Sequence, residues 1–231
     1  MPAMTRTFRI ETVDEDGRDR EDLEISLHEP SLTGDWVGFK TWGSAFLLAQ
    51  KLQTIAVTHL SGLSAPSVLE LGSGTGLAGL VAAALWSTDV VLTDLPEILP
   101  NLAQNAETNK FAVESRGGSV TIEELNWADV QPHQGNYEVV MAVDALYSIE
   151  HAGLLAPAID GCLGYGKGAR VLIATPLRDK ATEKMLEEFT ALMLERGLEN
   201  IAHGDEFGFE DWEVNGERAR VHTWWGIWKR V

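Results

Sequence analysis

The chain has little of several features that would assign it to a specialised class. Cys162 is its only cysteine, so neither an intrachain disulfide nor a zinc site built from several thiolates can form. No apolar run approaches the roughly 18 residues of a membrane-spanning helix, and the first residues, MPAMTRTFRI, lack the apolar stretch of a signal peptide. We therefore expect an intracellular, reducing compartment, with the cytoplasm as the default, and no membrane partner.

Basic residues are scarce as well. Lysine and arginine number 18 against 35 aspartates and glutamates, which gives a net charge of -17 and a pI near 4.6. This balance argues against non-specific nucleic-acid binding, which needs a basic surface. A solvated acidic exterior is the commoner explanation, and a basic partner is the other. The six histidines show no metal-ligand spacing, so we predict no metal site.

What the chain does have is the composition of an ordinary globular protein, with 45% hydrophobic and 23% charged residues. Its 231 residues are enough for a substantial core, and they contain no repeat, low-complexity tract or long linker. We expect a single domain, 1–231, with an N-terminal hairpin or extension over about 1–43. In that extension, TFRIETV and LEISLHE alternate apolar and polar residues on either side of the acidic turn DEDGRDRED.

Beyond the extension, a helical pattern runs from about Ser44 to Leu60, and strand-like and helix-like segments then alternate from Pro66. Such alternation predicts an α/β fold with a mostly parallel sheet and helices on both faces. We expect a helix over 96–111 with Pro96 near its start. The last segment, 219–230, reads as a strand that pairs with one near 198–204, which would add an antiparallel edge.

The stretch VLELGSGTGLAGL, residues 68–80, places three alternating glycines directly after the first strand of this alternation. Ligands of open α/β sheets bind beyond the carboxyl ends of the strands, and glycine lets the backbone approach them. A dinucleotide turn needs G-x-G-x-x-G, whereas here Leu77 stands at the sixth position. The Gly-Lys-Ser/Thr of a phosphate loop is absent too. The turn therefore favours a ligand without a pyrophosphate.

Two acidic residues indicate which ligand that is. Glu70 precedes the turn and suits an ammonium group, and it would repel pyrophosphate. Asp94 ends the second strand, 22 residues after Gly72, where its carboxylate can accept both hydroxyls of a ribose. An ammonium and a free ribose diol occur together in S-adenosylmethionine. We therefore predict S-adenosyl-L-methionine as cofactor, with S-adenosyl-L-homocysteine as product.

These motifs, together with Asn126-Trp127 and the DALY of 144–147, resemble the seven-β-strand protein lysine methyltransferases called methyltransferase family 16. The segment VGFKTWGSAFLLAQKL, residues 37–52, resembles the fungal branch that methylates translation elongation factors. The likeness covers about residues 35–180. It implies a seven-stranded, Rossmann-like class I methyltransferase fold.

The resemblance also implies roles for individual residues. Those expected to contact the cofactor are Trp42, Gly72, Ser73, Gly74, Asp94, Trp127 and Ala142, in addition to Glu70, which is expected there from its charge. Asp144 and Tyr147 would lie at the mouth where the target lysine arrives, with Asp144 orienting its ammonium and Tyr147 against its stem. Structural alternatives stay open: Trp42 could be a core residue, and Asp144 could cap the helix that begins near Ile149.

Other tryptophans give weaker indications. Trp224, Trp225 and Trp228 are more simply explained by packing in the last strand, whereas Trp36 and Trp212 could contact a substrate.

The predicted activity is methyl transfer to a protein lysine, with an elongation factor as the target that the resemblance implies, and the enzyme is expected to be a monomer. Two alternatives remain. The acceptor could be a histidine, an N-terminal amine or a small molecule, or the protein could bind the cofactor without turnover as a partner of another protein.

Overall fold

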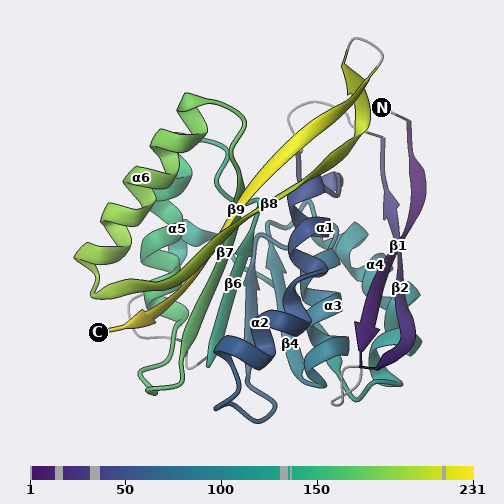
Figure 1. Cartoon of the computed structure of the whole chain (residues 1–231), viewed down its shortest axis with the longest axis horizontal. Helices are drawn as coiled ribbons and strands as arrows, with labels where there is room; N and C mark the ends of the chain where they lie inside the picture. Colours follow the sequence, from purple (N-terminus) through teal and green to yellow (C-terminus); the bar gives the residue numbers. More distant parts are fainter. Residues whose placement is uncertain (1, 14–17, 32–36, 131–134, 136, 215–216) are drawn as a thin grey trace.

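The protein is described from a computed structural model that covers residues 2–13, 18–31, 37–130, 135, 137–214 and 217–231. In this part of the chain, seven strands form one sheet in the order β5-β4-β3-β6-β7-β9-β8 (Figure 1). Their bounds are β3 (Val68–Leu71), β4 (Asp89–Asp94), β5 (Ser119–Glu124), β6 (Val139–Val143), β7 (Arg170–Pro176), β8 (Leu198–Val214) and β9 (Glu217–Arg230). The first five are parallel, and β9 and β8 are added antiparallel. The predicted fold class and the antiparallel C-terminal strand are confirmed.

Helices cover both faces of the sheet. Successive side chains of each strand point to opposite faces, and apolar side chains on both faces need to be covered. Leu69, Val140 and Ile173 pack toward α5 (Ile149–Cys162) and α6 (Lys180–Glu195), whereas Val68, Met141 and Leu172 face the other side. That second face is covered by α1 (Gly43–Ala49), α2 (Leu52–His59), α3 (Leu77–Trp86) and α4 (Leu99–Glu114). Residues 77–84 of α3 are all buried, which explains a helix that is apolar around its whole circumference.

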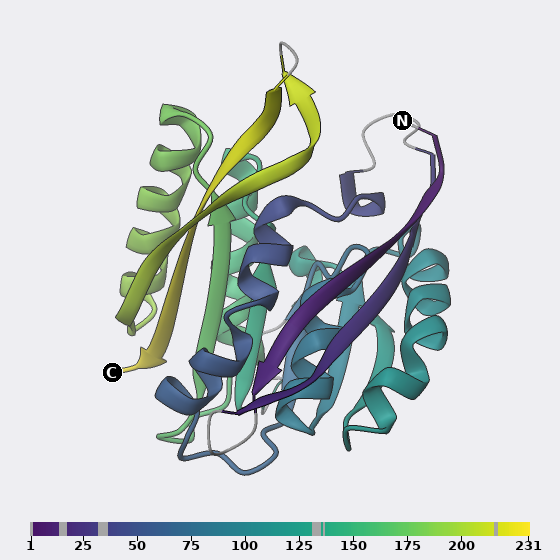
Figure 2. The ribbon, with the colours of Figure 1, turned by 45° about the vertical axis from the view of Figure 1, so that its right-hand side comes forward.

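The N-terminal residues form the expected hairpin, a separate antiparallel pair of β1 (Met4–Val13) and β2 (Asp19–Glu29) (Figure 2). Its buried face joins the same core as α3 and α4. The edge of β2 that does not pair with β1 is covered by α4. There the side chains of Asn105 and Asn109 form hydrogen bonds of 2.7–3.1 Å with the backbone of His28 and Ser26. Residues 14–17 of the predicted acidic turn lie outside the described residues.

Three boundary predictions are wrong. The single helix expected over 44–60 is two helices, because Lys51 donates to Leu48 in a tighter turn that ends α1. The fourth helix begins at Leu99 instead of near Pro96. Its first turn holds Pro100, which needs no hydrogen-bond partner there. Strand β8 extends to Val214, well past the expected 198–204.

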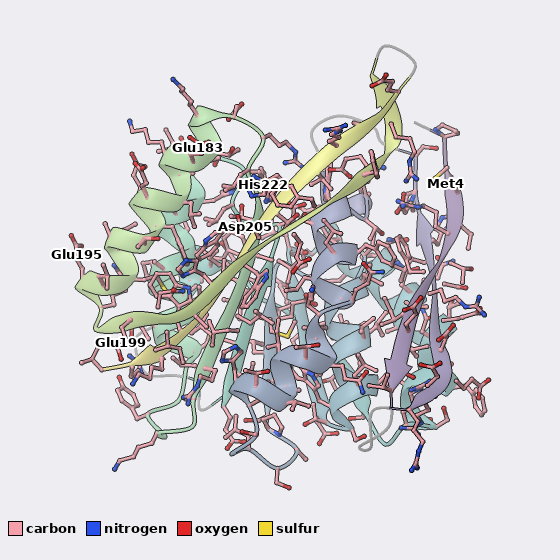
Figure 3. The ribbon with its side chains drawn as sticks, in the orientation of Figure 1. Met4, Glu183, Glu195, Glu199, Asp205 and His222 are labelled. Carbon is pink, nitrogen blue, oxygen red and sulfur yellow. The ribbon has the colours of Figure 1, made fainter. Side chains whose placement is uncertain are left out.

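The long β8–β9 pair brings the C-terminal part of the chain to the carboxyl ends of the parallel strands. Pro176, the last residue of β7, pairs with Thr223, and the earlier residues of β9 pair with β8 alone. The hairpin therefore projects beyond the sheet (Figure 1). Across this hairpin, Nε2 of His222 lies 2.6 Å from Oδ1 of Asp205 (Figure 3). Among the helices that the structure describes, none has the length and apolarity to cross a membrane.

Candidate active site

A cavity of about 380 Å³ lies at the carboxyl ends of β3, β4 and β6. The structure brings nine predicted site residues to its walls: Trp42, Glu70, Gly72, Ser73, Gly74, Asp94, Trp127, Asp144 and Tyr147. Ala142 is placed elsewhere. Its side chain is fully buried in the core beneath α5, while its neighbour Val143 lines the cavity. Adjacent strand residues point to opposite faces, so only one of this pair can face the cavity with its side chain.

The backbone conformation and the close packing of the turn both require glycine at positions 72 and 74. Gly72 and Gly74 have φ of 70° and 56°, a region that favours glycine. A Cβ on Gly72 would lie 2.8 Å from a ring carbon of Trp127. One on Gly74 would lie 3.1 Å from the carbonyl oxygen of Gly38, in the short helix η1 (Val37–Phe39). Close packing of Trp127 and η1 thus adds to the need for room beside a ligand.

Glu70 holds a carboxyl group at the inner end of the cavity. Its side chain is buried beside α3, and burial raises its pKa to about 8. Contacts with Ser73 and the backbone of Gly79 lower this pKa by less than burial raises it, and within the described residues the Oε2 atom makes no hydrogen bond of normal geometry. A buried oxygen of this kind costs free energy until a donor reaches it. A ligand with an ammonium group would supply that donor.

Asp94 is held by backbone donors. One carboxylate oxygen accepts from the N–H of Gly74 and the other from that of Leu95, each at 2.8 Å. Burial raises the pKa of this carboxyl group. Each oxygen keeps a further lone pair, so the group can accept two hydroxyl donors without losing either backbone bond.

Three aromatic side chains, Trp127, Tyr147 and His151, also line the cavity. The ring of His151 lies 4.0 Å from Tyr147 and 5.6 Å from Trp127, edge to face in both cases. Partial burial lowers the pKa of His151, which favours its uncharged form. Sequence reasoning missed this residue. Its spacing of four from Tyr147, on the first turn of α5, is a pattern that could have identified it.

Asp144 lies directly after β6, with a left-handed φ of 57° and only 7% of its side chain exposed. It accepts a hydrogen bond from the hydroxyl of Ser44 and lies 4.0 Å from the guanidinium of Arg178. The alternative that it caps α5 is wrong, because its carboxylate bonds Ser44, on α1, instead. Burial raises the pKa of Asp144 to about 6.

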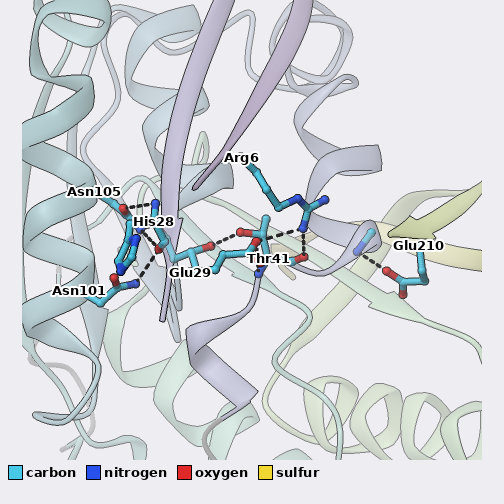
Figure 4. A network of polar contacts seen from close by, with 9 residues as sticks. Arg6, His28, Glu29, Thr41, Asn101, Asn105 and Glu210 are labelled. Carbon is cyan, nitrogen blue, oxygen red and sulfur yellow. Dashed lines mark hydrogen bonds and ion pairs between the residues drawn. The ribbon is translucent and has the colours of Figure 1, made fainter. Parts of the chain in front are cut away.

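Trp42 lines the cavity, and two cations lie near its ring. The guanidinium of Arg178 lies 5.2 Å from its ring centre, and the ammonium of the buried Lys40 lies 5.9 Å away. The backbone on either side of Trp42 is held by two buried glutamates (Figure 4). Glu29 accepts from Thr41 at 3.1 Å, and Glu210 accepts from Gly43 at 2.9 Å.

The remaining tryptophans divide as expected where they are described. Trp228 is fully buried against Phe189, and Trp224 and Trp225 pack on opposite faces of the sheet, so the packing interpretation is confirmed. Trp36 and the side chain of Trp212 lie outside the described residues. Within those residues, no group of three or more histidine, cysteine, aspartate or glutamate side chains could hold a metal ion.

Strand order, glycine turn and strand-end acid together define a class I methyltransferase fold. Solved structures agree. A candidate RNA methyltransferase from Pyrococcus horikoshii has a TM-score of 0.61 at 14% identity, covering 87% of this chain and 91% of its own. TYW2 of M. jannaschii, solved in complex with AdoMet, has a TM-score of 0.55 at 12% identity, over 98% of this chain and 88% of its own.

The sequence itself matches the lysine methyltransferase family over residues 19–192, and the chain belongs to that family.

Two yeast protein-lysine N-methyltransferases are similar to this chain over most of its length. The protein-lysine N-methyltransferase EFM2 of Saccharomyces cerevisiae is 32% identical over 91% of this chain, and rrg1 of Schizosaccharomyces pombe is 34% identical over 90%. This chain spans 52% of the length of EFM2 and 67% of that of rrg1. The EEF1A lysine methyltransferase 3 of Mus musculus is 32% identical over 52% of this chain and 50% of its own length.

Proposed function

We propose that the chain is an S-adenosylmethionine-dependent protein-lysine N-methyltransferase. The observation that carries this proposal is the pair of acids around the glycine turn, Glu70 with its unpartnered oxygen and Asp94 with its backbone-held carboxylate. Membership of the lysine methyltransferase family supports the same activity.

The residues that line the cavity fit the chemical groups of this cofactor. Glu70 offers an acceptor to the ammonium, and the buried Lys40 offers a cation to the carboxylate. Asp94 can accept the two ribose hydroxyls, and Trp127 offers a ring to the adenine. When bound, the cofactor supplies an electrophilic methyl group on a sulfonium. Ala142 remains a proposed contact only through its backbone, because its side chain is in the core.

Elsewhere in the cavity, the carboxylate of Asp144 would accept a hydrogen bond from the ammonium group of the incoming lysine. Tyr147 would pack against the aliphatic part of the lysine side chain. The lysine must lose a proton, which we assign to water, before its nitrogen can attack. The nitrogen then forms a bond to the methyl carbon as the carbon–sulfur bond breaks and its electron pair stays on sulfur. Aligning nitrogen, carbon and sulfur is the main contribution of the protein.

For the substrate we propose a translation elongation factor. Two points support this choice: the mouse relative is named for EEF1A, and residues 37–52 resemble the fungal branch that methylates translation elongation factors. The net charge of -17 suits a basic partner surface. We further propose a single domain over 1–231 that works as a monomer in the cytoplasm.

Calorimetry tests the cofactor. S-adenosylmethionine and S-adenosylhomocysteine should bind, whereas NAD and ATP should give no heat. Comparable binding of NAD would overturn the proposal.

The acceptor is tested with radiolabelled S-adenosylmethionine and an extract from cells that lack this enzyme. We expect one strongly labelled protein, with the label on a lysine nitrogen of an elongation factor. Label on a histidine, an N-terminus or a small molecule would reassign the acceptor. Cofactor binding without any labelled product would favour a non-catalytic role.

A further inference from the structure

The acceptor side of the cavity holds a cluster of three charged side chains from three separate elements. Arg178, from the loop after β7, lies 4.0 Å from Asp144 and 3.5 Å from Glu210. Glu210 belongs to β8 and lies beyond residues 19–192, the part of the chain that matches the family. The C-terminal hairpin therefore contributes to the site through a residue that no motif marks.

Glu210 is 3% exposed, and both of its oxygens have partners. One accepts from the backbone of Gly43, at the start of α1, and the other faces Arg178. A buried carboxylate is tolerated only with such compensation. Through Gly43, Glu210 also fixes the neighbouring Ser44, whose hydroxyl donates to Asp144. Glu210 thus reaches Asp144 by two routes, through Arg178 and through α1.

The other side of Trp42 provides a natural comparison (Figure 4). There Glu29 accepts from Thr41 and pairs with Arg6 at 3.0 Å, so a buried glutamate again joins a backbone N–H to an arginine. This second pair has the same chemistry and holds the same segment. The difference is that its arginine reaches the carbonyl of Thr41, whereas Arg178 reaches Asp144.

We propose that Arg178 and Glu210 are positioning residues of the acceptor site. Glu210 anchors Arg178 and the start of α1, and Arg178 in turn orients Asp144. Two carboxylates around one guanidinium leave one negative charge in excess, which matches the single positive charge of a lysine side chain. This inference rests on the proposed function for its substrate, although the charge cluster can be tested in the free protein.

The titration of Asp144 provides that test, because its two charged neighbours act on it in opposite directions. The groups that face it are Ser44 from α1, Arg178, Glu210 and Tyr147; of these, Arg178 lowers the pKa of Asp144 and Glu210 raises it. Arg178→Gln should raise the pKa of Asp144, and Glu210→Gln should lower it, each by about half a unit to one unit, since Arg178 is partly exposed.

The measurement is carboxyl-carbon NMR of Asp144 in the full chain without ligand. Arg6→Gln and Glu29→Gln are the matched controls and should leave the titration unchanged. Arg178→Lys keeps the positive charge and should stay near the wild-type value. A general loss of packing would move both site variants the same way, so shifts of the same sign, or no shifts, would overturn the proposal. The Gln substitution at Glu210 keeps an acceptor for Gly43, which favours a folded variant.

The second readout is the pH dependence of kcat/KM on the identified lysine substrate. In the pH profile of kcat/KM, the change of slope that reports the ionisation of Asp144 is expected near pH 6. It should move to higher pH in Arg178→Gln and to lower pH in Glu210→Gln. If the wild type methylates lysine and the slopes do not move, the positioning role is wrong and the function stands. If the NMR shifts occur and lysine is never methylated, the cluster stands and the proposed function is wrong.

Discussion

Asp94 and Asp144 are both carboxylates at the carboxyl ends of parallel strands, and the protein holds them in different ways. Asp94 is fixed by two backbone N–H groups from its own turn and the adjacent glycine turn. Asp144 is fixed by side chains, the hydroxyl of Ser44 and the guanidinium of Arg178, and only 7% of its side chain is exposed. A backbone N–H does not titrate and is kept in every substitution except one to proline, so the first acid has a fixed environment. The environment of Asp144 depends on side chains that a substitution can remove.

This difference matches the two tasks proposed for the cavity. A cofactor of constant shape is served by a fixed acceptor. A lysine side chain binds as a cation and is then methylated, so its partner carboxylate needs a charge that neighbouring residues can adjust. The pKa of about 6 at Asp144 places its ionisation close to the working pH, where such neighbours have most effect.

The largest effect is expected from Asp144→Asn, which keeps the shape and removes the charge. Truncating one member of a desolvated charge pair costs about 2–5 kcal/mol. Methylation of the identified substrate should therefore fall by roughly 30-fold to several thousand-fold. Tyr147→Phe, which keeps the ring, is the matched variant and should retain most of the rate. Methylation by Asp144→Asn at a rate close to wild type would remove this carboxylate from the mechanism.

A smaller effect is expected on the cofactor side from Lys40→Met. A hydrogen bond to a charged group contributes about 1.5–3 kcal/mol, so S-adenosylhomocysteine should bind on the order of 10- to 100-fold more weakly. Methylthioadenosine lacks the amino-acid end and should bind the variant and the wild type equally. Lys51→Met serves as a surface control. Equal losses for both ligands would show that Lys40 supports the cavity and does not pair with the carboxylate.

Glu70 gives a prediction about stability and pH. Its folded-state pKa of about 8 lies above the ordinary 4.5, so the folded protein holds a proton that the unfolded chain has released. Stability from this group is therefore present below about pH 4.5 and is lost as the pH rises toward 8, with a slope of at most about 1.4 kcal/mol per unit. Denaturant unfolding of ligand-free protein should show this fall, and Glu70→Gln should flatten it. A wild-type curve as flat as the variant's would mean that Glu70 is already ionised.

The smallest effect concerns the acidic surface. Exposed acids such as Glu183 and Glu195 on α6 point outward (Figure 3). If this surface attracts a basic substrate, kcat/KM should fall a few-fold between about 50 and 300 mM salt, because the Debye length falls below ~10 Å. Binding of S-adenosylhomocysteine should change much less. A flat response would make the net charge of -17 a matter of solubility alone.

The same contrast explains how much the sequence could predict. Glu70, the glycine turn and Asp94 lie within 25 residues of one another, and the rules of parallel sheets alone bring them together. Ser44, Asp144, Arg178 and Glu210 are spread over more than 160 residues, and Glu210 reaches the other three only because β8 extends beyond the strand-like segment near 198–204 to Val214. Sequence reasoning also could not decide between Ala142 and Val143, because one step along a strand reverses the direction of the side chain, and it is the side chain of Val143 that lines the cavity.

The central claim is that the two strand-end acids serve two different ligands, and the affinity for S-adenosylhomocysteine tests it most directly. Calorimetry on wild type, Asp94→Asn and Asp144→Asn compares two identical changes of charge. Asp94→Asn should weaken binding by about 2–3 kcal/mol, roughly 30- to 150-fold, because the ribose hydroxyls lose a charged acceptor. Asp144→Asn should bind within about twofold of wild type, a change of less than about 0.5 kcal/mol. Equal losses in the two variants, or a larger loss in Asp144→Asn, would contradict the account.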